Sequence, residues 1–64
     1  MKKEQYKHGG MTINLDWLPA NQAWMVWRED YGYQALNRIY TEAWEAREDF
    51  DARVAFFKQV LNGE

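Results

Sequence analysis

A chain of 64 residues without a single cysteine has few ways to stay folded. A domain of this size buries only about 60% of the surface that its unfolded chain exposes. Natural chains this short usually add a disulfide, a metal or a partner to a core that supplies about 3–5 kcal/mol. The lack of cysteine excludes disulfides and thiolate metal sites, and His8 is the only histidine. Dense aromatic packing and association with another chain remain as ways to stabilise the fold.

Aromatic residues offer the largest apolar surface in this chain. Four Trp, four Tyr and three Phe are present, and each can bury roughly 150–250 Å². No apolar run approaches the roughly 18–20 residues that a membrane span needs. Lys7 and His8 stand where a signal peptide would carry its apolar segment. We therefore expect a cytoplasmic protein without membrane contact.

Residues 11–17 alternate between apolar and polar side chains, which is the period of a half-buried strand. The Gly-Gly pair before them suits a two-residue hairpin turn, because glycine tolerates positive φ. Such a turn would place Tyr6 opposite Ile13 and His8 opposite Met11. The segment before the turn is therefore the first strand of a hairpin or, alternatively, a loose basic arm.

A first helix is predicted at residues 19–31. Pro19 suits the first turn of a helix, where its missing N–H has no intrahelical partner. Apolar residues then follow at steps of four, three and four, which places them on one helix face; they are Ala20, Trp24, Trp27 and Tyr31. Gly32 suits the residue that ends a helix.

A second, longer helix is predicted at residues 34–61, a stretch without Gly or Pro. Alternating steps of four and three define one stripe: Leu36, Tyr40, Ala43, Arg47, Phe50, Val54, Phe57 and Leu61. Its continuity favours a single helix about 42 Å long. The alternative is a break near Asp49, which could cap a third helix. The predicted fold class is mainly α, with a short N-terminal strand or β-hairpin followed by an antiparallel helical pair.

The apolar stripe is longer than the first helix, which would span only about 18 Å. The expected core consists of Trp17, Trp24, Trp27, Tyr31, Leu36, Ile39, Tyr40 and Ala43. Apolar residues beyond it would need a second chain to cover them. The predicted protein interface consists of Trp44, Phe50, Val54, Phe56, Phe57, Val60 and Leu61. The alternative is a compact three-helix fold that buries this end in its own core.

Charge is divided unevenly along the chain. Residues 1–10 carry three basic groups and one acidic group, and residues 11–64 carry five basic and nine acidic groups, giving +2 and −4. An acidic body repels a phosphate backbone, so nucleic acid is not the expected partner. An acidic ridge is predicted on the second helix at Glu42, Glu45 and Asp49, and a solvated helix face is its ordinary meaning.

Catalytic groups are scarce. The chain has no Ser and no Cys, so the Ser/His/Asp and Cys/His arrangements cannot be built. The Glu-x-x-His motif of di-iron bundles and the Gly-rich phosphate loop are also missing from the sequence. We therefore expect no enzymatic activity, no cofactor, no metal and no small-molecule substrate.

The sequence favours a small protein–protein interaction module: a regulator, inhibitor or adaptor that binds another protein or forms a homodimer. Its size, tryptophan content and acidic body are common among accessory proteins of bacteriophages and mobile elements. Two alternatives stay open. One is a structural or assembly factor of a larger particle, and the other is a protein that associates with nucleic acid or mimics it.

Overall fold

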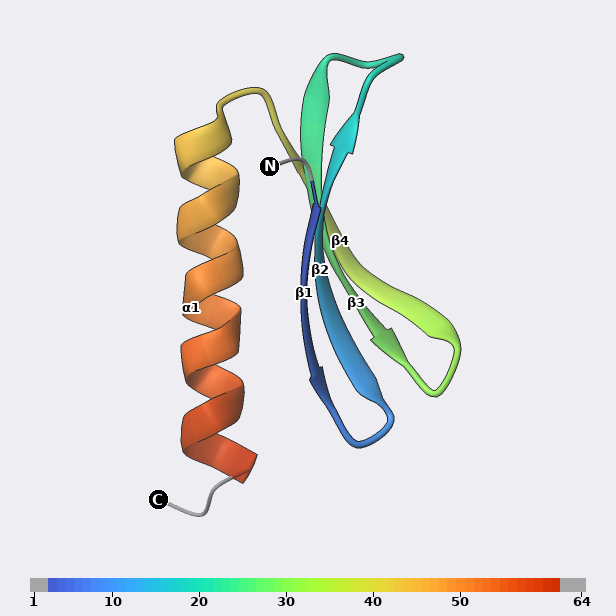
Figure 1. Ribbon diagram of the computed structural model, residues 1–64, viewed down its shortest axis with the longest axis vertical. Coiled ribbons are helices and arrows are strands. Elements are labelled where there is room, and N and C mark those ends of the chain that lie inside the picture. Colours follow the sequence, from blue (N-terminus) through green and yellow to red (C-terminus); the bar gives the residue numbers. More distant parts are fainter. Residues whose placement is uncertain (1–2, 62–64) are drawn as a thin grey trace.

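One antiparallel sheet and one helix make up residues 3–61, the part of the chain that the computed structural model describes (Figure 1). The strands pair in chain order and are β1 (Lys3–His8), β2 (Met11–Leu18), β3 (Ala23–Asp30) and β4 (Tyr33–Tyr40). The helix α1 (Ala43–Leu61) follows β4 and lies across one face of the sheet. The chain is therefore a four-stranded meander with a helix on one side.

The predicted N-terminal hairpin is confirmed. Tyr6 pairs with Ile13 and His8 pairs with Met11, as the alternation in the sequence predicts. Gly9 adopts a φ of 61°, which a glycine accepts without steric cost. The strand after the turn extends one residue beyond the predicted range, to Leu18.

The predicted first helix is wrong, and so is the mainly α fold class. Residues 19–22 form a turn and β3 follows them. Trp24 pairs opposite Trp17 and packs against the core under α1, whereas Trp27 lies on the other face of the sheet. Both faces of β3 carry large apolar side chains, so the sequence lacks the apolar–polar alternation that identifies a strand. The three-residue spacing of Trp24 and Trp27 then resembles that of a helix face.

The predicted second helix begins nine residues too early. Residues 33–40 form β4, and α1 starts at Ala43. Tyr31 and Gly32 form the two-residue turn between β3 and β4, with φ of 50° and 93°. Positive φ at both positions is the signature of a hairpin turn whose twist matches that of its strands. Gly32 therefore serves a hairpin and not the end of a helix.

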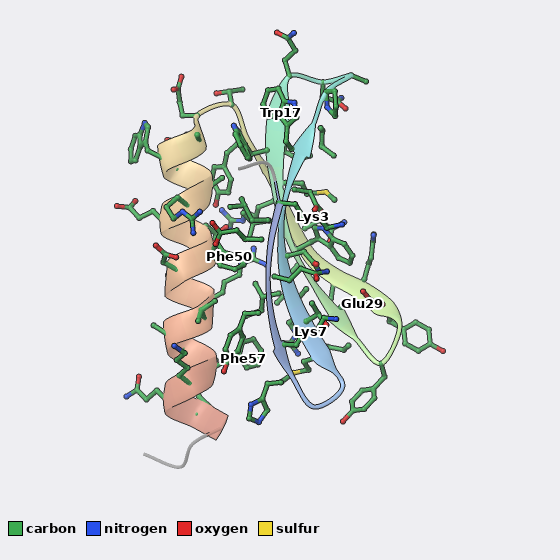
Figure 2. The ribbon with its side chains drawn as sticks, viewed as in Figure 1. Lys3, Lys7, Trp17, Glu29, Phe50 and Phe57 are labelled. Atoms are coloured by element: carbon green, nitrogen blue, oxygen red, sulfur yellow. The ribbon has the colours of Figure 1, made fainter. Side chains whose placement is uncertain are left out.

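The core lies between α1 and the middle of the sheet. It consists of Ile13, Leu15, Val26, Ala46, Phe50 and Phe57, all buried. Figure 2 shows Phe50 and Phe57 pointing from α1 toward the strands. The interface predicted at Phe50, Val54 and Phe57 is thus corrected: the first two-thirds of the chain cover these side chains, with Phe50 5% and Phe57 8% exposed. The side chain of Leu61 lies outside the described part.

The predicted core set also needs correction. Trp24 and Tyr40 do pack against the core, and Trp17 is half-buried beside Trp24 with ring centroids 4.9 Å apart. Trp27 is half-buried on the opposite face. The others lie at the surface: Leu36 and Ile39 on the edge strand β4, Tyr31 in the turn before it, and Ala43 at the start of α1.

On the sheet face away from α1, side chains of neighbouring strands form hydrogen bonds with each other. Trp27 donates its indole N–H to Asp16 at 2.6 Å, and Gln5 donates to the side-chain oxygen of Asn14 at 2.8 Å. Asn14 is 1% exposed beneath this layer. Antiparallel sheets commonly present one such polar face to water.

Charged side chains join α1 to the β1 side of the sheet. Arg47 donates two hydrogen bonds to the carboxylate of Glu4, and the ammonium of Lys58 lies 5.8 Å from the ring centre of Tyr6. The Arg47 guanidinium holds the pKa of Glu4 below its ordinary value. These side-chain contacts therefore connect α1 to β1.

Two phenylalanines on α1 test this placement of the core. We expect Phe50→Ala to lower the free energy of unfolding by about 3–5 kcal/mol, because a buried ring leaves a cavity. Phe56→Ala should change it by less than about 0.5 kcal/mol, since Phe56 is 61% exposed. Urea titration followed by tryptophan fluorescence at low protein concentration measures both. Equal losses would contradict the orientation of α1.

The Glu4–Arg47 pair predicts a difference in acid stability. A carboxyl whose folded-state pKa is lowered contributes stability above its ordinary pKa of 4.5, and this contribution is lost as pH falls through the lowered value. Wild type should therefore exceed Glu4→Gln in stability at pH 7, and the gap should close in acid. Glu29→Gln, at a side chain without an ion pair among residues 3–61, should run parallel to wild type. Urea titrations from pH 7 to pH 2 measure the three curves.

Candidate docking groove between the helix and the fourth strand

The flank of α1 beside β4 is open. The β3–β4 hairpin diverges from α1 toward the C-terminal end of the helix (Figure 1). Two adjoining hollows of about 490 Å³ and about 350 Å³ follow this flank. The larger is lined by Arg28, Leu36, Asn37, Arg38, Ala52, Arg53, Phe56 and Phe57, and we name it the basic half. The smaller is lined by Tyr40, Trp44, Glu45, Glu48, Asp49 and Ala52, and we name it the acidic half.

Three arginines and no carboxylate line the basic half, on a chain whose residues 11–64 hold only five basic groups. Arg28 donates two hydrogen bonds from Nε and Nη2 to the carboxylate of Asp30, which lies outside the lining, and its guanidinium lies 4.9 Å from the ring centre of Phe57. This hydrogen bonding lowers the pKa of Asp30. Arg28 is thus fixed between a carboxylate and an aromatic ring.

A hydrogen-bonded chain crosses the boundary between the two halves. Tyr40 donates its hydroxyl hydrogen to Asp49 at 2.6 Å, and Arg53 donates to the same carboxylate at 2.9 Å. The bond to Asp49 raises the pKa of the Tyr40 hydroxyl, because that bond requires the protonated form. The Nη1 atom of Arg53 is buried and has no hydrogen-bond partner within residues 3–61.

Arg38 differs from the other two arginines. Its side chain is exposed, and it forms no ion pair with any residue from 3 to 61. Since Arg28 and Arg53 already face carboxylates, Arg38 supplies the net positive charge of the basic half. An incoming carboxylate would therefore meet a guanidinium that lies near the Tyr40 hydroxyl and forms no ion pair with a carboxylate of residues 3–61.

Leu36 forms one lip of the basic half in a strained backbone conformation. It is 64% exposed and has a φ of 56°. The register between β3 and β4 shifts here, so that Leu36 and Asn37 lie opposite the single residue Trp27. Glycine usually occupies the left-handed position of such a bulge. A leucine there costs about 1–2 kcal/mol, and strain of this kind clusters at functional sites.

Phe56 forms the opposite lip, and Trp44 lies in the acidic half. Phe56 is 61% exposed and Trp44 is 62% exposed. Both are on α1, on the flank turned away from the core. Each half thus combines one exposed aromatic side chain with charge of a single sign.

The groove contains part of the predicted site and leaves out the rest. Trp44 and Phe56 from the predicted interface line it, and Val60 lies one turn beyond Phe56 and is 54% exposed. From the predicted acidic ridge, Glu45 and Asp49 line the acidic half, whereas Glu42 precedes α1.

The sequence analysis did not identify the three arginines or Leu36 as site residues. Arg28, Leu36 and Arg38 lie in strands that were predicted to be helical, whereas Arg53 lies on a correctly predicted helix whose strand partners were misplaced.

Comparisons with protein-family models, with curated proteins and with solved structures found no match to this chain. Within residues 3–61 no helix is long and apolar enough to cross a membrane. The same residues contain no cluster of three or more His, Asp or Glu side chains that could hold a metal ion. The candidate site therefore depends on the geometry and chemistry of the groove itself.

The strain at Leu36 can be measured. We expect Leu36→Gly to raise the free energy of unfolding by about 0.5–1 kcal/mol, because the released strain exceeds the extra chain entropy of glycine. Ile39→Gly is the matched control: Ile39 lies on the same strand and is 56% exposed, but its φ is not positive. This control should lose about 1 kcal/mol. Urea titration measures both, and a loss of stability in Leu36→Gly would contradict the strained conformation.

Proposed function

We propose that this chain is a non-enzymatic protein-interaction module, a regulator or adaptor, that docks a protein segment in the groove between α1 and β4. The observation that carries the proposal is the composition of the groove: three arginines between the exposed side chains of Leu36 and Phe56. Aromatic residues and arginine are the side chains most enriched where proteins bind each other tightly.

The distribution of exposed apolar side chains supports this surface over others. The seven large hydrophobic residues most exposed within residues 3–61 all lie between residues 31 and 60. They are Tyr31, Tyr33, Leu36, Ile39, Trp44, Phe56 and Val60. Three of them line the groove, on two elements that face each other. Contiguous apolar surface of this kind commonly marks an interaction site.

The non-enzymatic part of the proposal rests on the chemistry of the side chains present. The groove contains guanidinium, carboxylate and tyrosine groups. Among its carboxylates, Asp49 already accepts hydrogen bonds from Tyr40 and Arg53. His8 is exposed on β1, outside the residues that line the groove. A cytoplasmic location is part of the same proposal, because a chain without cysteine gains nothing from an oxidising compartment.

Site-specific photocrosslinking in the cells that naturally express the chain tests the proposal. The photoreactive residue p-benzoylphenylalanine replaces Phe56 in one variant and Tyr33 in another. Both positions carry exposed aromatic side chains, 61% and 78% exposed, but only Phe56 lines the groove. We expect irradiation to join the Phe56 variant to a protein and to leave the Tyr33 variant free.

The outcomes of this experiment either support or contradict docking in the groove. An adduct at Phe56 whose yield falls when Leu36→Asp is added supports docking in the groove. A Phe56 variant that forms no adduct, or one that reacts no more than the Tyr33 variant, contradicts the proposed function. Far-ultraviolet circular dichroism of each variant verifies that the sheet and α1 are retained.

A further inference from the structure

We propose that the occupant of the groove is a second copy of this chain, with its α1 antiparallel to the first and a two-fold axis at Ala52. This inference rests on the proposed function and names the partner. The two halves of the groove meet at Ala52, which lines both. A rotation by 180° about that point places the basic half of each copy on the acidic half of the other.

Charge complementarity carries the inference. The basic half is lined by three arginines without a carboxylate, and the acidic half by Glu45, Glu48 and Asp49 without a basic residue. Opposite charges arranged in sequence along one flank attract an antiparallel copy and repel a parallel one. A two-fold contact of this type uses the same surface on both chains and closes after two copies.

The spacing of the exposed residues on α1 fits the same symmetry. Five of them form a row with steps of four residues: Trp44, Glu48, Ala52, Phe56 and Val60. Rows of this spacing interdigitate when helices pack against each other. With the axis at Ala52, Glu48 and Phe56 lie at equal distances, about 6 Å, on either side of it. The small Ala52 at the axis lets the two helices approach closely.

One ion pair across the axis is specific enough to test. Neither Arg38 nor Glu48 has an ion-pair partner among residues 3–61. Arg38 lines the basic half with Phe56, and Phe56 is related by the axis to the level of Glu48. Arg38 of each copy therefore meets Glu48 of the other, and the dimer contains this pair twice.

Charge reversal provides the experiment. Arg38→Glu places two acids at each contact, and Glu48→Arg places two bases there. We expect each variant alone to raise the dimer dissociation constant at least tenfold, measured by sedimentation equilibrium as a shift from about 15 kDa toward the monomer mass of 7.7 kDa. An equimolar mixture of the two variants should recover a heterodimer, because both contacts then join opposite charges. Native mass spectrometry identifies that species.

Controls separate association from folding. Lys58→Glu makes the same charge change as Arg38→Glu on the opposite flank of α1, where Lys58 lies near Tyr6, and should leave the dimer intact. Ala52→Lys is a second route that does not involve the charged pair. Ala52 is exposed, so this variant should keep its helical circular dichroism and become monomeric. A dimeric Ala52→Lys variant would overturn the position of the axis.

Two further outcomes would overturn the inference. One is a wild-type chain that sediments at 7.7 kDa at several hundred micromolar. The other is a mixture of Arg38→Glu and Glu48→Arg that stays monomeric. The photocrosslinked product at Phe56 then shows whether the proposed function still holds. An adduct at Phe56 with a different protein preserves docking and rejects the second copy, whereas no adduct rejects both.

Discussion

One helix cannot cover four strands, and the rest of the molecule follows from that mismatch. An α-helix is about 10 Å across, whereas four strands spaced about 4.8 Å apart present a wider face. Phe50 and Phe57 place α1 over the middle of the sheet, and Arg47 joins it to Glu4 on β1. Because α1 packs on β2 and β3, parts of both outer strands stay uncovered. On the β4 side this uncovered strip lines the groove.

The charged groups of the groove are arranged before any partner arrives. Arg28 is held by Asp30 and by the ring of Phe57, and Arg53 is held by Asp49. Side chains that are already ordered lose less conformational entropy when a complex forms. Guanidinium groups beside apolar surface also keep their charge at all relevant pH values. The basic half of the groove therefore combines two ordered guanidinium groups with the exposed apolar side chains of Leu36 and Phe56.

The sequence predicted the two ends of the chain better than its middle. The N-terminal hairpin followed from a clean alternation and a glycine pair, and its register was correct at Tyr6 and His8. The apolar face of residues 43–61 was also recognised as helical, although it was assigned to a partner and not to the sheet. The middle failed because β3 has apolar residues on both faces. Trp24 and Trp27, three residues apart, then resemble a helix face. Once β3 was predicted to be a helix, β4 was also misassigned, and Arg28 and Arg38 could not be placed opposite Arg53 on α1.

The bulge at Leu36 has a consequence for how copies of this molecule can add to one another. A sheet with two free edges can grow without limit, strand against strand, into fibres. Here the displaced backbone at Leu36 interrupts the regular hydrogen-bonding row of one edge, and the exposed lysines Lys3 and Lys7 lie on the other. Both devices discourage edge-to-edge pairing. The two edges of the sheet therefore disfavour open-ended growth by strand addition, which matters for a small chain rich in aromatic residues.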